Sequence, residues 1–157
     1  MRNARSYAIQ AQFTTVTTSK TLIQLATGAT TPAWIDYVSC EGQSDVADAM
    51  EIILVRKSGA ATVTSFTPLI MMQGAGTEQI ANAVGGAALT GTNASAEGTD
   101  TDVLFRWSVS VQAGGGLQIW FPEGLVLVGA ASFIGLKLNN TITSQTLTAS
   151  LQFSELG

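Results

Sequence analysis

Three evenly spaced carboxylates are the first residues of this 157-residue chain that could do chemistry. Asp45, Asp48 and Glu51 would align on one turn of a helix, and three carboxylates could hold a hard cation such as Ca²⁺. A calcium site needs about six to eight oxygen ligands, and the neighbouring residues do not form an EF-hand loop pattern. The sequence therefore favours a solvated loop before a strand, and we predict no metal site.

A second acidic pair, Asp100 and Asp102, would lie on one side of an extended segment. A glycosidase would need two carboxyl groups that face each other across a cleft. Neither acidic group has flanking aromatic residues that would stack on a sugar. The alternative is the polar start of a strand, where two neighbouring carboxylates are common.

The chain has no histidine and a single cysteine, Cys40. Catalysis by Ser-His-Asp or Cys-His groups is therefore excluded, as are histidine metal sites, an internal disulfide and a cysteine-cluster zinc site. Cys40 stands in a strand pattern and is expected to be a small buried apolar residue. The glycines at 114–116 lack the Lys-Ser/Thr of a phosphate-binding loop and are expected to form a hairpin connection. We therefore expect no enzyme, no catalytic residue and no cofactor.

The basic residues are few. The chain has 7 Lys and Arg against 11 Asp and Glu, so its formal net charge is −4, which argues against direct nucleic-acid binding because such affinity comes largely from phosphate neutralisation. Arg2 and Arg5 lie on a short N-terminal arm, predicted as residues 1–6. We predict that these two arginines are partner-binding residues that dock onto an acidic partner. The alternative is a disordered terminus.

The low charge points to protein contacts. Charged residues make up only 11% of the chain, against about 25% in an average soluble domain. Thr, Ser, Ala, Gly, Gln and Asn must therefore cover much of the exterior, and such a neutral surface costs little to desolvate. We expect a subunit of an assembly, with a soluble monomer bearing a Thr-rich sheet as the alternative. No apolar run approaches ~20 residues, so no membrane span is expected, and the first residues do not resemble a signal peptide.

The elements that must position these groups are strands. Apolar and polar residues alternate over 7–13, 103–111 and 147–153, a pattern typical of half-buried antiparallel strands. Further strands are expected over 21–25, 34–40, 51–57, 117–121, 125–128 and 135–138, and the apolar run 52–55 suits a central strand covered on both sides. Residues 44–50 and 77–84 could each form a short helical turn. Residues 74–101 are interpreted as a long surface excursion of loop and irregular strand.

This pattern predicts one domain over residues 1–157. Many short strands with turn signals every ~8–12 residues indicate an all-β fold, an antiparallel β-sandwich of jelly-roll-like type. Its expected core consists of the apolar residues of the alternating segments: Ile9, Phe13, Leu25, Ile53, Val55, Phe105, Trp107, Val109, Leu117, Ile119, Leu136, Leu138, Leu151 and Phe153.

Three segments carry a resemblance to a known family. A polar loop at 43–49 leads directly into the strand at 51–56, the segment Phe105-Arg106-Trp107 comes much later, and an alternating stretch over 147–157 closes the chain. In this order the chain resembles a loose family of small all-β proteins encoded by tailed bacteriophages near their capsid genes. Its general character is similar to that of head decoration, or cement, proteins. The resemblance implies a β-sandwich that trimerises at three-fold positions of a capsid lattice, and it supplies no active-site residues.

Two functions follow as expectations. The first, implied by the resemblance, is a structural virion protein that is made in the host cytoplasm, binds the major capsid protein on the outer surface of the capsid as a homotrimer, and stabilises the head. The alternative is a tail, neck or head-fibre component that recognises host carbohydrate. Trp34, Asp36 and Tyr37 are the local candidates for such a sugar site, although a sandwich fold by itself does not give a function.

Overall fold

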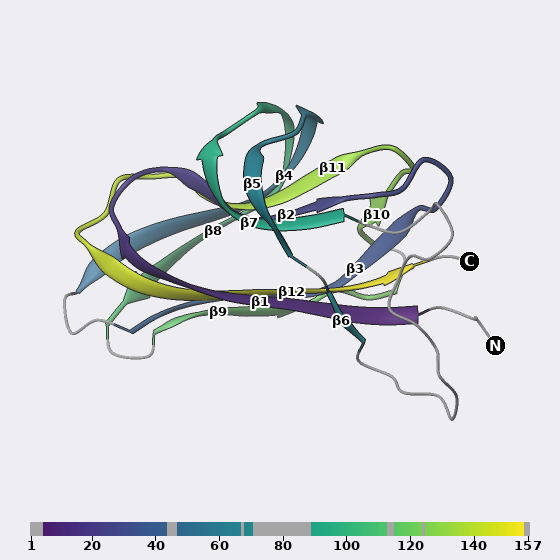
Figure 1. Ribbon diagram of the computed structural model, residues 1–157. Helices are drawn as coiled ribbons and strands as arrows, with labels where there is room; N and C mark the ends of the chain where they lie inside the picture. Colours follow the sequence, from purple (N-terminus) through teal and green to yellow (C-terminus); the bar gives the residue numbers. More distant parts are fainter. Residues whose placement is uncertain are drawn as a thin grey trace.

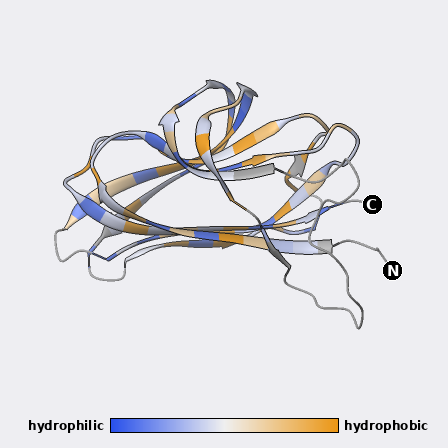
Figure 2. Ribbon diagram, viewed as in Figure 1, coloured by the Kyte–Doolittle hydropathy of each residue, from blue (hydrophilic) through white to orange (hydrophobic). Residues whose placement is uncertain are grey.

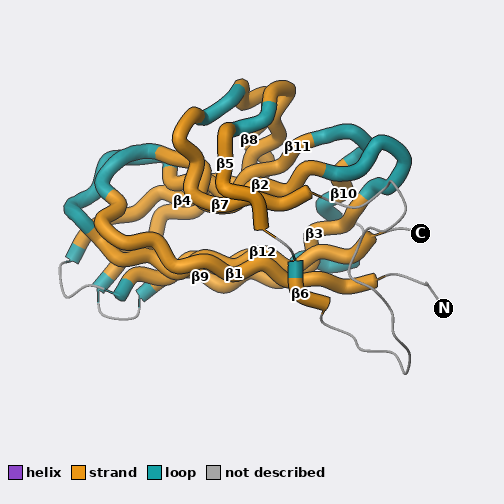
Figure 3. The backbone as a smooth tube through the Cα atoms, in the orientation of Figure 1, coloured by secondary structure: helices purple, strands orange, loops and turns teal. Residues whose placement is uncertain are grey.

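The structure is a computed structural model that describes residues 5–43, 47–66, 68–70, 89–112, 115–123 and 125–155. These residues form twelve strands and no helix, and so contain no helix that is long and apolar enough to cross a membrane. The strands make two antiparallel sheets packed face to face (Figure 1, Figure 3). The predicted all-β antiparallel sandwich is confirmed, while its jelly-roll character stays a prediction.

Sheet A contains both ends of the described chain. Its strands are, in spatial order, β10 (Leu127–Val128), β3 (Ala33–Gly42), β12 (Gln145–Glu155), β1 (Arg5–Val16) and β6 (Leu69–Ile70), with β9 (Gly116–Trp120) also paired to β3. Sheet B has the order β5 (Thr62–Phe66), β7 (Leu89–Ala96), β2 (Lys20–Ala26), β11 (Phe133–Leu138), β4 (Asp48–Gly59) and β8 (Thr99–Val111).

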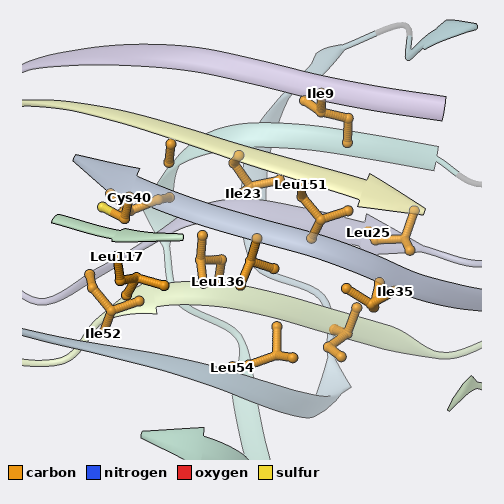
Figure 4. Close-up of a cluster of buried hydrophobic side chains, with 14 of the residues drawn as sticks. Ile9, Ile23, Leu25, Ile35, Cys40, Ile52, Leu54, Leu117, Leu136 and Leu151 are labelled. Atoms are coloured by element: carbon orange, nitrogen blue, oxygen red, sulfur yellow. The ribbon is translucent and has the colours of Figure 1, made fainter. Parts of the chain in front are cut away.

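The core lies between the sheets because alternate residues of each strand face inward. In sheet A, Ile9 is the register partner of Leu151, and Tyr7 is that of Phe153, whose ring lies 5.3 Å from the tyrosine ring. Figure 4 shows apolar side chains of the two sheets meeting, and Figure 2 shows hydrophobic and hydrophilic residues alternating along the long strands. The alternation seen in the sequence is therefore the division between core and surface.

The predicted core is confirmed except at two sheet edges and on β4. Phe105, Trp107, Val109 and Ile119 are only partly buried and pack against the core from outside it. The first three lie on β8, which is the last strand of sheet B, and Ile119 lies on β9 at the margin of sheet A. An edge strand has a neighbour on one side only, so its apolar residues are covered less completely. The remaining residues predicted for the core are buried. Ile53 and Val55, however, do not belong to the core cluster, to which β4 contributes Ile52 and Leu54 instead.

One expectation about local structure is wrong in the described part of the chain, and a second is confirmed only in part. Residues 48–50 begin strand β4 rather than a helical turn, and they pair with the end of β8; Ser44 to Val46 and residues 77–84 lie outside the described residues. Residues 89–96 of the supposed surface excursion form β7, which pairs with both β2 and β5. The expected irregularity occurs at Asn93, which has a positive φ of 55° beside a register shift.

The connection at Gly115 also differs from the expected hairpin. It joins β8 of sheet B to β9 of sheet A, so it crosses between the sheets. The amide of Gly42 donates to the carbonyl of Gly115 at 2.9 Å, which ties the crossing to β3. After β9, the amide of Leu125 donates to the carbonyl of Pro122 at 3.0 Å, which closes a turn.

The ribbon formed by β4 and β8 bends and continues as β5 and β7. Gly59 pairs with Thr99 before the bend, and Thr62 pairs with Ala96 after it, so the ribbon rises above sheet B (Figure 1) and returns to pair with β2. Gly98 turns here with φ +67°, and a Cβ on it would lie 2.4 Å from the carbonyl oxygen of Gly59. The bend therefore requires glycine at this position.

We expect Phe153→Ala to destabilise the fold by about 3–5 kcal/mol, because a fully buried aromatic ring at the centre of sheet A would leave a cavity. Trp107→Ala should cost clearly less, since its ring is partly exposed and stacks on Phe105 at the edge of sheet B. Urea unfolding of both variants measures the difference in the free energy of unfolding. A larger loss for Trp107→Ala would contradict this assignment of core and edge.

Candidate functional site

Charged side chains are divided unequally between the two sheets. Every lysine and arginine whose side chain the structure describes lies on sheet B: Lys20, Arg56, Lys57, Arg106 and Lys137. Sheet B and its connections also carry five described carboxylates: Asp48, Glu51, Glu97, Asp100 and Asp102. Sheet A and its connections carry four: Asp36, Glu41, Glu123 and Glu155. Among the described side chains, sheet B is therefore neutral (+5 and −5), whereas sheet A with its connections carries four negative charges.

The outer face of β1 and β12 carries uncharged residues, all of them polar except Ala8. The residues that alternate with the core ones on these two strands are Ser6, Ala8, Gln10, Gln12, Thr148, Ser150, Gln152 and Ser154. Many of them are hydrogen-bonded across strands. The hydroxyls of Ser6 and Ser154 lie 2.9 Å apart, and those of Ser39 and Ser150 lie 2.6 Å apart. We call this surface the neutral field.

An exposed aromatic pair lies beside the neutral field. Tyr37 of β3 and Trp120 of β9 are register partners, and their ring centroids are 4.4 Å apart with the planes tilted by 41°. Trp120 is 68% exposed, the most exposed large apolar residue described. Sequence reasoning missed Trp120 as a site residue. The available signal was that Leu117 and Ile119 face the core, so Trp120 must face outward.

Of the three residues predicted for a sugar site, Tyr37 belongs to this pair, and the structure places Trp34 and Asp36 near it. Ile35 and Val38 both face the core. Between them β3 has one extra residue relative to β12, and this β-bulge places Trp34 and Tyr37 on the same outer face. Asp36 lies between them, and its carboxylate accepts a hydrogen bond of 2.6 Å from the Ser154 hydroxyl. Partial burial raises the pKa of Asp36, and the nearby charge of Glu123 raises it further, against the opposing effect of Ser154.

A third carboxylate lies on the same face. Gln118, which alternates with the core residues of β9 as Trp120 does, donates a hydrogen bond of 2.6 Å to Glu41. The Tyr37–Trp120 pair therefore has Asp36 next to it in the chain, and Glu41 lies four register positions further along β3. We call the pair together with Asp36, Glu41 and Glu123 the aromatic–acidic patch.

An ionic cluster around the buried Lys57 holds the bend of sheet B. The Lys57 ammonium lies 2.5 Å from Asp100 and donates to the carbonyl of Glu97 at 2.7 Å, while Lys137 binds the other oxygen of Asp100 at 2.6 Å. The Lys57 side chain has no exposed surface and lies across Gly135, where a Cβ would be 3.0 Å from the lysine Cε. These contacts fix the β7–β8 turn onto the sheet, so we interpret the cluster as structural.

Asp48 and Glu51, the two described residues of the acidic group considered for a metal site, have separate partners. Asp48 accepts hydrogen bonds from the amides of Thr143 and Ala49, and the Thr143 bond above all lowers the pKa of Asp48. Glu51 instead forms an ion pair with Arg106. Asp45 lies outside the described residues, and no described group of three His, Cys, Asp or Glu residues could hold a metal ion.

The other predicted residues have separate surroundings. Asp100 belongs to the ionic cluster, whereas Asp102 is exposed. Cys40 is fully buried, and burial, with a smaller effect of Glu41, raises the pKa of its thiol to about 12. Arg2 lies outside the described residues. Arg5 begins β1 opposite Glu155, so part of the predicted arm is paired strand, and the Arg5 side chain also lies outside the described part.

Comparison with protein-family models, curated proteins and solved structures found no match. The functional interpretation therefore depends on the chemistry of the two outer faces. Sheet B is charged but internally neutralised, whereas sheet A combines the neutral field with the aromatic–acidic patch.

Acid should weaken the fold partly through Asp100. Burial opposes its ionisation, but hydrogen bonds and charges of Lys137 and Lys57 together lower the pKa of Asp100 below its ordinary value of 3.8. A lowered folded-state pKa gives stability that is present above the ordinary value and is lost as the pH falls through the lowered one. We expect the free energy of unfolding to fall below about pH 4, and Asp100→Asn to reduce this slope.

Urea unfolding over a pH series measures this effect. Asp102→Asn is the matched control, because it removes one carboxylate two residues away on the same strand. An unchanged acid slope in Asp100→Asn would show that the ionic cluster does not contribute to stability.

Proposed function

We propose that this chain is a structural virion protein, a capsid decoration or cement protein that docks through the outer face of sheet A. One observation carries the proposal: every described lysine and arginine side chain lies on sheet B, while β1 and β12 of sheet A present the neutral field. Hydroxyl and amide groups can exchange water for a protein partner at small cost, and neutral surfaces are typical of interface centres. The resemblance to phage head proteins gives the identity of the partner, the major capsid protein.

The face is large enough for a stable contact. β1 has 12 residues and β12 has 11, so each is about 40 Å long at about 3.4 Å per residue. β9, β3, β12 and β1 lie side by side, and four strands spaced by about 4.8 Å give a width of about 20 Å. The product, about 800 Å², matches one partner's share of a standard interface.

Docking would act mechanically. A protein that binds the assembled shell, and does not bind separated subunits, adds its binding free energy to the stability of the shell. As a homotrimer it would bridge several capsid subunits on the outer surface of the head and oppose the internal pressure of packaged DNA. Jelly-roll connectivity and the homotrimer are parts of this proposal, and the function requires neither cofactor nor catalysis.

A second candidate is host recognition by a tail, neck or head-fibre component that binds carbohydrate. The exposed Tyr37–Trp120 pair favours it, because aromatic rings stack on the apolar faces of sugars. Asp36 and Gln152, the register partner of Tyr37, could supply hydrogen bonds. The rest of the face argues less for sugar, since the neutral field extends far beyond the reach of one sugar site.

A lysine in the neutral field should block docking. Gln10 is exposed on β1 opposite Ser150, so Gln10→Lys would bury an unpaired ammonium in the interface, which is strongly unfavourable. We expect binding to undecorated capsids to weaken at least about tenfold. Ser110→Lys, which places the same charge on the exposed side of β8, is the matched control. Co-sedimentation with capsids measures both variants, and equal loss in both would contradict docking through sheet A.

We also expect the chain to form a homotrimer, or at least a stable oligomer on the particle. The reason is that a surface poor in charge is suited to contacts between copies. Multi-angle light scattering gives the mass of the purified protein, and cryo-electron microscopy of decorated capsids gives its state when bound. A monomer in both settings would show that the homotrimer is wrong.

A further inference from the structure

One edge of strand β1 is open in the part of the chain that the structure describes. β12 pairs with β1 on one side, whereas on the other side β6 pairs only with Tyr7 and Ala8 (Figure 1). No described strand pairs with that side of β1 over residues 9–13. After Phe13 the regular pairing ends at a register shift, where Thr15 has a positive φ of 57°. We call this side of residues 9–13 the open edge.

The backbone groups that point to the open edge belong to Gln10 and Gln12. The amide of Gln43 donates to the carbonyl of Thr146 at 2.9 Å, so the backbone groups of Thr146 face β3. Such groups alternate in direction along an antiparallel strand, so every second residue of β12 after Thr146 also bonds to β3, and the residues between them bond to β1. The partners of these intervening residues on β1 are Phe13, Ala11 and Ile9. The amides and carbonyls of Gln10 and Gln12 therefore face away from β12, toward the open edge.

The open edge lacks the features that protect sheet edges from pairing. Residues 9–13 are Ile-Gln-Ala-Gln-Phe, with no charge, no proline and no register shift. Edge strand β8 of sheet B, in contrast, carries exposed Asp102 and Arg106 and has three register shifts against β4. Charges and irregularities of this kind keep an edge from pairing with another chain. The open edge of β1 is therefore suited to the addition of a strand.

We propose that the open edge of β1 pairs with the same edge of a second copy of this chain. The contact goes beyond the proposed function, because it joins two copies and requires no capsid protein. Antiparallel pairing centred on Ala11 would place Gln10 of each copy opposite Gln12 of the other, in bonded pairs. No charges would oppose each other, and the glutamine side chains, which both donate and accept, could hydrogen-bond across the pair. This match of the strand to itself favours a second copy as the occupant.

The two ends of the open edge fit the same arrangement. With the pairing centred on Ala11, β6 of one copy would lie near the register shift of the other copy, where β1 leaves its regular path. The two-fold axis of an antiparallel pair is perpendicular to the sheet, so the neutral fields of both copies would face the same side. A contact with two-fold symmetry differs from the contact that builds a homotrimer. On a capsid it could join copies that belong to neighbouring homotrimers.

Disulfide trapping on the full chain tests the pairing. One preparation carries Gln10→Cys and another carries Gln12→Cys, and the two are mixed and oxidised. Opposed residues of a bonded pair have Cα atoms about 5.5 Å apart, which a disulfide can span, so we expect a covalent dimer on a non-reducing gel. Each preparation alone should give at least about fivefold less dimer, because the two cysteines are then diagonal neighbours about 7–8 Å apart. Cys40 should not interfere, since it is fully buried.

Two charge variants test the same register without a covalent bond. Gln10→Lys with Gln12→Lys would place like charges opposite each other, whereas Gln10→Lys with Gln12→Glu would place a lysine opposite a glutamate. We expect the first double variant to weaken self-association at least about tenfold in sedimentation velocity, and the second to restore it. Both side chains are exposed, so both double variants should keep the fold.

Three outcomes would overturn the proposal: no dimer from the mixture, as much dimer from either preparation alone, or equal self-association of the two charge variants. If Gln10→Lys prevents docking onto capsids but the mixture gives no dimer, the proposed function stands and the β1 contact is wrong. A trapped dimer of a chain that does not dock onto capsids would support the β1 contact and contradict the capsid role.

Discussion

The antiparallel pairing of β1 with β12 is the interaction on which the rest of the structure depends. It joins Arg5 to Glu155 and continues, through a register shift, to the pair Val16–Gln145. β12 also pairs with β3 over nearly its whole length, so the three strands form the middle of sheet A. Their inward residues supply one side of the core, and their outward residues form the neutral field. One register therefore sets both the hydrophobic core and the surface that we propose for docking.

Sequence reasoning predicted most of the strands because the alternation of apolar and polar residues is a local signal. The periods at 7–13 and 147–153 predicted both β1 and β12 and the buried residues on them. β7 was not predicted, because Gly91 and its Thr, Asn and Ala neighbours carry no apolar face of their own. Gly91 is instead required by close packing, since a Cβ on it would lie 2.1 Å from Val63. Such a constraint depends on a neighbour that is distant in sequence.

The candidate site also combines features with a local sequence signal and features that depend on residues distant in sequence. The sequence indicated a neutral surface and pointed to Asp36 and Tyr37, but Trp120 stands 83 positions after Tyr37 and meets it only because β9 pairs with β3. The location of the described lysine and arginine side chains on sheet B could not be predicted from the sequence either, because it depends on which sheet each strand joins. Composition predicts how much charge a chain carries, whereas topology decides which face carries it.

The position of β12 at the end of the described chain also has a consequence for synthesis. All strands of sheet B lie between Lys20 and Leu138, so this sheet can assemble while the last strand is still within the ribosome. β1 and β3 must wait for β12, which separates them in the finished sheet, and pairing between such distant segments is slow to form. A nascent chain that stops before β12 would lack the paired strands β1 and β12 that carry the neutral field. The surface proposed for docking would therefore form after sheet B.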